Sequence, residues 1–314
     1  MMLHYDSQQT SAALPFPKLV QAIKKMFSDG CEVPLRHNHA INNAEGGKLG
    51  TLLLMPAWQP QSWLGVKTVS IFPGNHQHHL PGLHSVYILY SAQTGKPAAI
   101  FDGDSITSRR TAASSALAAR YLSRENSRTL LIVGAGWVAE LLAEAYLSVR
   151  PIQKFLIWNQ THHKAEALAS RLQKKGLAAE AVSSLEEAVK QSDIVSCATL
   201  STTPLIKREW LRPGTHLDLI GGFTPEMRES DDACFADTSV FVDTEEALMK
   251  AGDLLSPIQA GIFAPEQVKA TLSDLCRNHH QGRLNQHEIT VFKSVGSALE
   301  DLAAAVLAYE TLNP

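Results

Sequence analysis

Two glycines and an alanine come directly after a run of aliphatic residues near the middle of the chain. The run is Thr129-Leu-Leu-Ile-Val133, long enough for one buried strand, and residues 138–147 then read as a helix without Pro or Gly. Between them, Gly134 permits a tight turn, Gly136 lets the backbone approach a pyrophosphate, and Ala139 keeps helix and strand close. The N–H groups at the start of the helix also attract phosphate. Strand, turn and helix together predict a dinucleotide-binding site.

The alternative for this motif is a tight strand-to-helix turn in an α/β domain that binds no nucleotide. The glycine spacing alone is weak evidence, but its strand–turn–helix context favours binding. The residues that we expect at the turn are Gly134, Gly136, Trp137 and Val138.

The end of the next predicted strand indicates which nicotinamide cofactor binds. That strand is Lys154-Phe-Leu-Ile-Trp158, and NAD-specific sites usually have Asp or Glu at this point, about 20 residues past the glycines. No acid follows here, so nothing repels the 2′-phosphate of NADP. Polar side chains suited to that phosphate are Asn159, Thr161, His162 and Lys164. The sequence therefore favours NADPH and leaves NADH possible; the alternative is a merely solvated loop.

Neither the cysteines nor the histidines have the spacing of a metal site. The four cysteines form no Cys-x-x-Cys pair, and reduced thiols of a cytosolic protein are the simplest interpretation. His76, His78 and His79 cluster, but no carboxylate or cysteine accompanies them at a helical or hairpin spacing. We expect a solvated loop there and no metal.

The chain before the glycine motif has strands of its own. An amphipathic helix is predicted over residues 17–28, followed by four strands with short turns, at residues 50–56, 64–72, 85–91 and 98–101. Such a succession predicts a mostly antiparallel sheet. An Ala- and Ser-rich helix over residues 111–122 follows.

From residue 129 onward strands alternate with helices, which predicts a parallel sheet. Ligands bind at the carboxyl ends of strands in such sheets. The strand over residues 193–200 therefore places Thr199 near the cofactor, and the strand over residues 215–222 does the same for residues 221–224. A strand at residues 289–292 and an Ala-rich helix from Ser297 come last. The predicted fold class is α/β: a Rossmann doubly wound parallel sheet plus an α+β domain.

Length and composition are those of a soluble protein with about two domains: 314 residues, 45% hydrophobic and 19% charged. A net charge of -3 gives no reason to expect nucleic acid or an anionic membrane as partner. No apolar run approaches the ~20 residues that span a bilayer, and the first residues lack the features of a signal peptide. We therefore expect a cytoplasmic protein.

Several short segments, taken in order, resemble the ornithine cyclodeaminase/mu-crystallin family over nearly the whole chain. Each is unspecific alone, and together they are highly specific. They are Pro34–His37, Val66–Val69, Phe72–Asn75, Arg110–Ala113, Gly134–Gly136, Arg212–His216 and Ile289–Gly296. The resemblance implies a Rossmann domain (residues 121–292) beside a substrate-binding and dimerisation domain (residues 1–120 with 293–314). It also implies a homodimer or a larger assembly of dimers.

The resemblance further implies that Arg36, Lys67 and Arg110 face the substrate. Substrates of the family are α-amino or α-imino acids, whose carboxylate favours charge-assisted donors. Arg36 and Arg110 would supply the guanidinium fork, and Lys67 a point charge or a proton. Lys67 and Arg110 are thus the implied catalytic residues. The alternative for each is a surface salt bridge, which we prefer for Arg109.

One residue departs from the family pattern. Cyclodeaminases and alanine dehydrogenases of this family carry an Asp after the Gly-Gly turn, where it handles the amine and acid–base steps. Here Phe223 occupies that place, and Phe neither binds an ammonium by charge nor moves a proton. Asp218 lies inside a predicted strand, so we do not assign the role to it. The departure disfavours ornithine cyclodeamination and suits a flat, apolar ring at Phe223.

The resemblance and this departure together imply an oxidoreductase acting on C=N bonds. The expected reaction is NADPH-dependent reduction of the cyclic ketimines Δ1-pyrroline-2-carboxylate and/or Δ1-piperideine-2-carboxylate to L-proline or L-pipecolate. The expected partner is therefore a small cyclic imino acid. One alternative is an ornithine cyclodeaminase or alanine dehydrogenase. Another is a mu-crystallin-like protein that binds a ligand with NADPH and does not turn it over.

Overall fold

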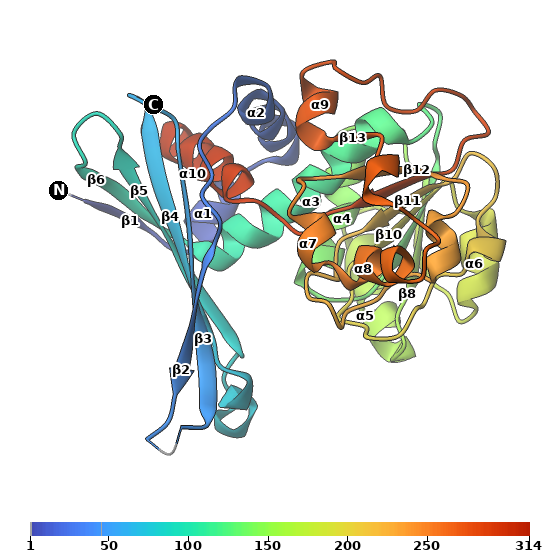
Figure 1. Cartoon of the computed structure of the whole chain (residues 1–314), viewed down its shortest axis with the longest axis horizontal. Coiled ribbons are helices and arrows are strands. Elements are labelled where there is room, and N and C mark those ends of the chain that lie inside the picture. Colours follow the sequence, from blue (N-terminus) through green and yellow to red (C-terminus); the bar gives the residue numbers. More distant parts are fainter. Residues whose placement is uncertain (1, 45) are drawn as a thin grey trace. The chain divides into compact units, whose positions relative to one another are not determined.

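The computed structural model describes residues 2–44 and 46–314, and the chain divides into two compact units (Figure 1). Unit 1 is Met1–Arg110 with Ser297–Pro314, and unit 2 is Thr111–Gly296. Each unit contains its own sheet. The last helix of the chain therefore belongs with the first third of the sequence.

Unit 1 is built on a six-stranded sheet in the order β1-β6-β5-β4-β3-β2. Neighbouring strands are antiparallel except that β1 runs parallel to β6, so the predicted mostly antiparallel sheet is confirmed. The strands are β1 (Leu3–Tyr5), β2 (His37–Asn42), β3 (Lys48–Trp58), β4 (Trp63–Ile71), β5 (Leu83–Ser91) and β6 (Pro97–Asp102).

The two faces of this sheet differ in burial. One row of side chains across four strands is fully covered, and it consists of Met55, Lys67, Tyr87 and Phe101. Helix α10 (Ala298–Leu312) contacts β3, β4 and β5 and also packs against α2 (Phe16–Asp29). Side chains alternate along a strand, so the next row lies on the opposite face. Its members are only partly buried: Pro56, Val66, Ile88 and Ile100.

Helix α3 (Gly103–Leu122) begins earlier than the helix predicted over residues 111–122. The Asp102 side chain accepts a hydrogen bond from the backbone N–H of Ser105 at 2.8 Å, and the Ser108 hydroxyl donates to the Asp104 carbonyl at 2.8 Å. Such local side-chain bonds stabilise a first turn whose residues have low intrinsic helix propensity. Arg110 consequently lies on a helix. The remaining short elements of unit 1 are α1 (Ser7–Ala12) and the 3₁₀ helix η1 (Pro73–His78).

Unit 2 contains an eight-stranded sheet, β13-β12-β14-β11-β10-β7-β8-β9, in which every pair of neighbours is parallel. The predicted Rossmann-type parallel sheet is confirmed. Its strands are β7 (Thr129–Val133), β8 (Lys154–Trp158), β9 (Ala179–Ala181), β10 (Ile194–Cys197), β11 (His216–Leu219), β12 (Ser239–Val242), β13 (Ala270–Thr271) and β14 (Thr290–Lys293).

Helices follow most of these strands, as a doubly wound sheet requires. They are α4 (Trp137–Leu147), α5 (His162–Lys174), α6 (Leu185–Gln191), α7 (Ala247–Lys250), α8 (Gly252–Gln259) and α9 (Leu272–Cys276), with 3₁₀ turns η2 (Arg208–Trp210), η3 (Asp232–Phe235) and η4 (Pro265–Gln267). The central strands are buried, and their apolar residues, for example Leu131, Val195 and Val291, belong to the hydrophobic core of unit 2. Within residues 2–44 and 46–314, no helix has the length and apolar character needed to cross a membrane.

Candidate functional site

Two cations and two carboxylates form a buried cluster in unit 1. Lys67 comes from β4, Arg110 from α3, and Glu300 and Asp301 from the first turn of α10. Lys67 Nζ lies 2.7 Å from Asp301 Oδ2 and donates to Thr107 Oγ1 at 3.1 Å. Arg110 donates from Nε to Asp301 Oδ1 at 2.8 Å and from Nη1 to Glu300 Oε2 at 2.6 Å. Asp301 therefore links both cations.

Burial and charge act in opposite directions on this cluster. Burial lowers the pKa of Lys67 to about 8, although Asp301 opposes the shift, and the charges of Arg110 and Arg36 lower it further. Burial alone would raise the pKa of Asp301, but Lys67 and Arg110 hold it below its usual value. Asp301 thus stays ionised beside a lysine that gives up its proton unusually easily.

Arg36 precedes β2 and is half-buried, close enough for its charge to contribute to the lowered pKa of Lys67. The structure therefore brings together Arg36, Lys67 and Arg110, the three residues that the resemblance implied. These three cations lie in one region of unit 1 with the carboxylates of Glu300 and Asp301. Cations gathered in this way attract an anionic group.

Arg109, the neighbour of Arg110, points elsewhere. Its Nε donates to the Leu14 carbonyl at 2.9 Å, and its guanidinium lies 4.4 Å from the centre of the Phe16 ring. These contacts give Arg109 a structural part in unit 1, and we place it outside the cluster.

Glu300 and Asp301 were not identified from the sequence. The signal was present: two adjacent acids stand in the first turn of a helix, and the seven residues that follow them are all Ala, Leu or Val. Both residues are 0% exposed, and buried carboxylates need partners. Two acids directly before such an apolar stretch therefore predict that the helix buries them against cations from another element.

The glycine turn of unit 2 has the geometry that a dinucleotide phosphate requires. Gly134 adopts φ +118°, donates to the Trp158 carbonyl at 2.8 Å, and would place a Cβ 2.5 Å from the Ala198 carbonyl oxygen. Gly136 precedes α4, and a Cβ there would meet nothing within 4 Å. No side chain caps α4, so its first N–H groups remain available. These features fit the pyrophosphate of a nicotinamide dinucleotide.

The other expected residues of this turn are accessible. Trp137 is 84% exposed and Val138 is half-buried. Glu140 in the first turn of α4 would repel a phosphate, but its carboxylate accepts a hydrogen bond from Arg171 Nε at 3.0 Å. That ion pair reduces the unfavourable charge.

The polar residues after β8 surround the start of α5. Asn159 Nδ2 donates to the Thr161 carbonyl at 3.0 Å, and Thr161 precedes α5 without capping it by its side chain. His162 Nε2 lies 3.6 Å from Glu166 Oε1. Thr161, His162 and Lys164 are exposed, and Asn159 is half-buried. The structure thus brings these polar groups together at one strand end.

A buried carboxylate joins the two loops that follow β10 and β11. Glu229 Oε1 accepts hydrogen bonds from the backbone N–H and the hydroxyl of Thr199, at 2.7 and 2.8 Å. Its Oε2 accepts from the N–H of Gly221 at 2.7 Å. Close approach makes Gly221 necessary, because a Cβ there would lie 1.8 Å from the Thr199 carbonyl oxygen. Thr199 and Gly221, both expected near the cofactor, are therefore held by one residue that sequence reasoning missed.

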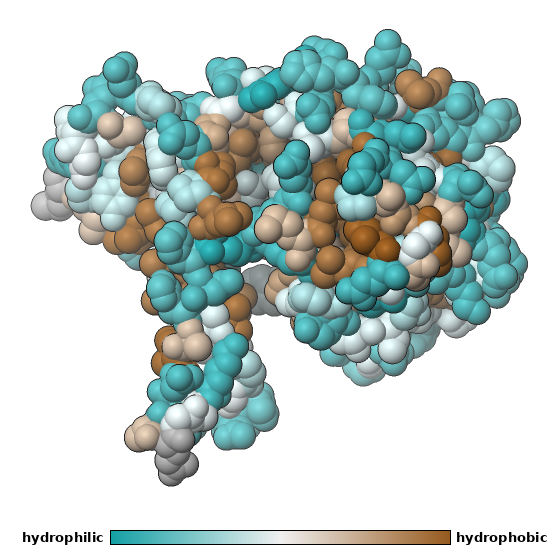
Figure 2. Space-filling view, viewed as in Figure 1, coloured by the Kyte–Doolittle hydropathy of each residue, from teal (hydrophilic) through white to brown (hydrophobic). Residues whose placement is uncertain are grey.

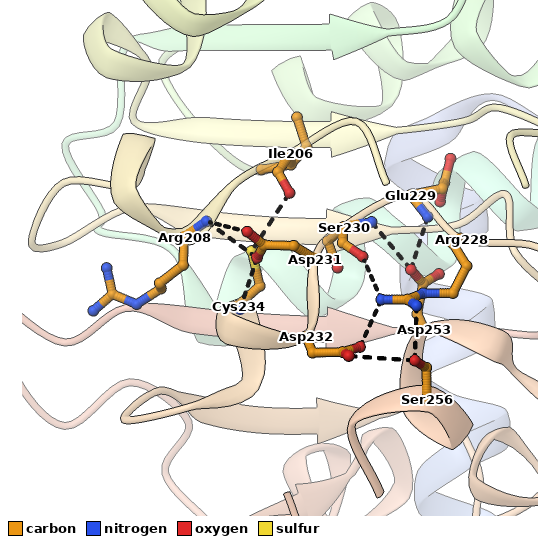
Figure 3. A network of polar contacts seen from close by, with 10 residues as sticks. All are labelled: Ile206, Arg208, Arg228, Glu229, Ser230, Asp231, Asp232, Cys234, Asp253 and Ser256. Atoms are coloured by element: carbon orange, nitrogen blue, oxygen red, sulfur yellow. Dashed lines mark hydrogen bonds and ion pairs between the residues drawn. The ribbon is translucent and has the colours of Figure 1, made fainter. Parts of the chain in front are cut away.

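Glu229 is itself fixed by a second carboxylate (Figure 3). Asp253 Oδ1 accepts from the N–H groups of Glu229 and Ser230 at 2.8 and 3.1 Å, and its Oδ2 lies 3.0 Å from Lys293 Nζ. Burial raises the pKa of Glu229 to about 7, with Lys293 opposing the shift and Asp253 adding to it. The network makes the carboxyl edge of β10 and β11 rigid.

Phe223 and Asp218 occupy different environments. Phe223 is 43% exposed in the loop after β11. Asp218 is fully buried in β11 and accepts hydrogen bonds from Ser115, Tyr146 and Ser196 at 3.2, 2.7 and 2.5 Å. With three donors around it, Asp218 is a structural residue, whereas Phe223 is accessible to solvent.

His76, His78 and His79 are exposed residues at η1. In the part of the chain that the structure describes, no group of three His, Cys, Asp or Glu side chains is placed to hold a metal ion.

The parallel sheet and its glycine turn define a Rossmann-type dinucleotide-binding protein that has a second compact unit. The family model for the ornithine cyclodeaminase/mu-crystallin family matches residues 17–314, and the chain belongs to that family. The resemblance noted in the sequence is thereby confirmed.

Among related sequences, a protein of Schizosaccharomyces pombe is 48% identical over 96% of this chain and 95% of its own length. A Delta(1)-pyrroline-2-carboxylate reductase of Paracoccus denitrificans is 40% identical over 86% of this chain and 88% of its own. Among solved structures, the Thermococcus litoralis Delta(1)-pyrroline-2-carboxylate reductase in complex with NADH and L-proline has a TM-score of 0.91 at 33% identity, covering 99% of this chain and 97% of its own. An archaeal alanine dehydrogenase dimer with bound NAD has a TM-score of 0.90 at 28% identity, covering 99% and 95%.

Proposed function

We propose that the protein reduces cyclic ketimines bearing a carboxylate, Δ1-pyrroline-2-carboxylate and/or Δ1-piperideine-2-carboxylate, to L-proline and/or L-pipecolate. The observation that carries the proposal is the buried cluster of unit 1, where three cations face two carboxylates and one cation is a lysine of lowered pKa. Such a cluster both attracts a carboxylate and holds a proton for an imine nitrogen. The names of the Paracoccus and Thermococcus relatives support the same reaction for this chain.

In this proposal each residue of the cluster has a separate role in binding or proton transfer. Arg36 and Arg110 bind the substrate carboxylate, for which Arg110 retains Nη2 because its bonds to Glu300 and Asp301 use Nε and Nη1. Lys67 donates a proton to the imine nitrogen, and its pKa of about 8 leaves it mostly protonated at neutral pH. Asp301 holds Lys67 and stabilises its charged form. The reduced nicotinamide, when bound, supplies the hydride to C2.

The substrate carboxylate provides the direct test of the cluster. Rates of NADPH oxidation should be compared with Δ1-pyrroline-2-carboxylate and with Δ1-pyrroline, which has the same ring and no carboxylate. We expect the carboxylate to improve kcat/KM by at least about 100-fold, since two charge-assisted bonds contribute on the order of 3 kcal/mol or more. Equal efficiency with both imines would exclude the cluster as a carboxylate site.

We further propose NADPH as the preferred cofactor. Support comes from Asn159, Thr161, His162 and Lys164 after β8, where no acid follows the strand. NADH remains the alternative, because the Thermococcus relative was solved with NADH. The ratio of kcat/KM with NADPH to kcat/KM with NADH measures the preference. Asn159→Asp should shift that ratio toward NADH. A native enzyme that is equally or more efficient with NADH would refute the preference.

Phe223 supports reduction over ornithine cyclodeamination. An imine needs only a hydride and one proton, whereas ornithine must lose hydride, cyclise and expel ammonia, and the acid–base group for those steps is absent at Phe223. The exposed ring of Phe223 instead offers an apolar surface to a planar substrate.

The two units receive separate roles in this proposal. Unit 2 is the dinucleotide-binding domain, and unit 1 is the substrate-binding and dimerisation domain of a homodimer. Support for the dimer is the partly exposed apolar row of the unit 1 sheet and the dimer named for the archaeal alanine dehydrogenase. A cytoplasmic location is proposed because none of the four cysteines forms a disulfide in the described structure, as in a reducing compartment.

A further inference from the structure

A hollow lined by several arginines lies in unit 2, outside the groups described above. Its volume is about 650 Å³, and four arginines and one acid are among its lining residues: Arg120, Arg124, Arg150, Arg283 and Glu125. Small-molecule pockets typically measure about 300–1,000 Å³, so the hollow is of a size for a ligand.

The hollow lies at the amino edge of the parallel sheet. Arg283 Nη2 donates to the Thr215 carbonyl at 3.2 Å, directly before β11, and Asp193, directly before β10, pairs with Arg124 Nη2 at 2.6 Å. The glycine turn and Thr199 follow strand ends, so they lie at the opposite edge. An occupant of the hollow is therefore distinct from the nicotinamide cofactor.

Two of the arginines have a structural task that uses their donors. Arg150 Nη2 donates to the carbonyls of Arg120 and Ser123, at 2.7 and 3.1 Å, and Arg283 Nε donates to the Leu122 carbonyl at 2.7 Å. These carbonyls end α3, where helices attract cations. Arg150 and Arg283 therefore cap the C-terminal end of α3, and they also contribute positive charge to the hollow.

The arginines also repel one another. Burial lowers the pKa of Arg283 to about 10, with Glu288 opposing the shift and the charges of Arg124 and Arg150 adding to it. Counting Glu125, Asp193 and Glu288 against the four arginines leaves one positive charge in excess. An anion in the hollow would relieve this repulsion.

The other two arginines have donors to spare. Arg124 uses Nη2 for Asp193, while its Nε is buried without a hydrogen-bond partner among the described residues. Arg120 is exposed, and its guanidinium makes no hydrogen bond or ion pair within residues 2–44 and 46–314. A buried, unused donor costs free energy that a bound acceptor would recover.

From this geometry we propose that the hollow binds a small oxyanion, through a phosphate or carboxylate group held by Arg120 and Arg124. The guanidinium fork matches both groups, and neutral amide donors from Asn126 and Gln286 line the same hollow. The ligand stabilises unit 2 by binding the folded state alone.

The test is isothermal titration of the full-length protein with inorganic phosphate and, separately, with citrate. We expect saturable binding of at least one anion, weakened about 10- to 100-fold by Arg120→Gln, the loss of one charge-assisted contact. Lys175→Gln removes an exposed lysine of unit 2 that does not line the hollow and should leave binding unchanged. Which anion binds more tightly identifies phosphate or carboxylate as the preferred group.

Saturating NADPH separates the hollow from the nucleotide site. We expect anion affinity to be the same with and without NADPH. The proposal is overturned if neither anion binds saturably, if Arg120→Gln binds as tightly as the native protein, or if NADPH abolishes anion binding. Neither the Arg120 nor the Lys175 side chain makes a hydrogen bond or ion pair within the described structure, so both variants should fold normally. Melting curves check this.

Discussion

Lys67 combines properties that are rarely found in one buried lysine. It is 2% exposed, it touches Asp301 and Thr107, and Arg110 and Arg36 add positive charge around it. Burial and the arginines favour the neutral amine, and Asp301 favours the ammonium. The Lys67 amine is therefore mostly charged at neutral pH, and its pKa of about 8 is close enough to neutral pH for proton donation.

The pH dependence of turnover follows from this balance. Lys67 must be protonated to donate, so kcat/KM for the ketimine should fall as pH rises through about 8, the pKa of Lys67 in the free enzyme. Lys67→Met should reduce kcat by about 10²–10⁴-fold. Asp301→Asn removes the charge that favours the ammonium and should move the alkaline limb to lower pH. An alkaline limb unmoved in Asp301→Asn would exclude Lys67 as the titrating group.

The carboxylate anchor is tested better at Arg36 than at Arg110. Arg110→Ala would remove the cation that pairs with Glu300 and leave Asp301 with Lys67 alone, which costs about 3–5 kcal/mol of stability in addition to any effect on binding. Arg36→Ala should lower kcat/KM for the ketimine about 10–100-fold. The Kd of NADPH, followed by fluorescence, should stay within about twofold. A parallel loss of cofactor affinity would show that Arg36 does not act on the substrate.

At the scale of elements, Glu229 controls the geometry of two loops at once. It accepts hydrogen bonds from Thr199 after β10 and from Gly221 after β11, and Asp253 and Lys293 fix its own position. Both loops extend from the carboxyl edge of the sheet, where ligands bind in this fold. Glu229 is therefore a positioning residue in our account.

Glu229→Gln replaces one acceptor oxygen by an N–H₂ group that faces a backbone N–H. We expect the KM for NADPH to rise about tenfold, with a smaller change in kcat at saturating cofactor. Asp231→Asn is the matched control, because the Asp231 carboxylate caps η3 by accepting from Cys234, also accepts from the Arg208 N–H, and bonds to neither Thr199 nor Gly221. An equal rise in KM in both variants would mean that general destabilisation, and no positioning, is responsible.

The elements show what sequence can and cannot provide. Alternation over residues 64–72 predicted β4 well, because one face of that strand is buried and the other is not. The start of α3 was missed, since its Ser- and Asp-rich first turn is stabilised by side-chain bonds that propensity does not reveal. Only the family resemblance predicted that Arg36, Lys67 and Arg110 belong to the site. Glu229, Glu300 and Asp301 were missed, because their partners lie on other elements and become neighbours only in the fold.

At the scale of the whole molecule, the sheet of unit 1 has an apolar face that the chain leaves partly open. Val66, Ile88 and Ile100 are half-buried, and Val86 on the same face of β5 is 44% exposed. Figure 2 shows apolar side chains among polar ones along the strands of unit 1. Exposed apolar surface of this kind usually marks a contact with another chain.

If that face forms the proposed dimer, Val86→Glu should produce monomers. A charge buried at a subunit contact costs several kcal/mol, enough to dissociate a dimer at micromolar concentration. Val33→Glu, at a position 41% exposed outside the strands, is the control and should remain dimeric. Sedimentation velocity distinguishes the two masses. A Val86→Glu protein that sediments like the native dimer would place the interface elsewhere.

We propose that this chain reduces a preformed cyclic imine and does not deaminate ornithine. The most direct measurement supplies the purified protein with NADPH and Δ1-pyrroline-2-carboxylate in one reaction, and with NAD⁺ and ornithine in another. Proline is quantified in both reactions and ammonia in the second. We expect one proline per NADPH oxidised in the first reaction, and neither ammonia nor proline above background in the second. Robust ammonia release from ornithine, with little reduction of the imine, would contradict the account and make the protein a cyclodeaminase.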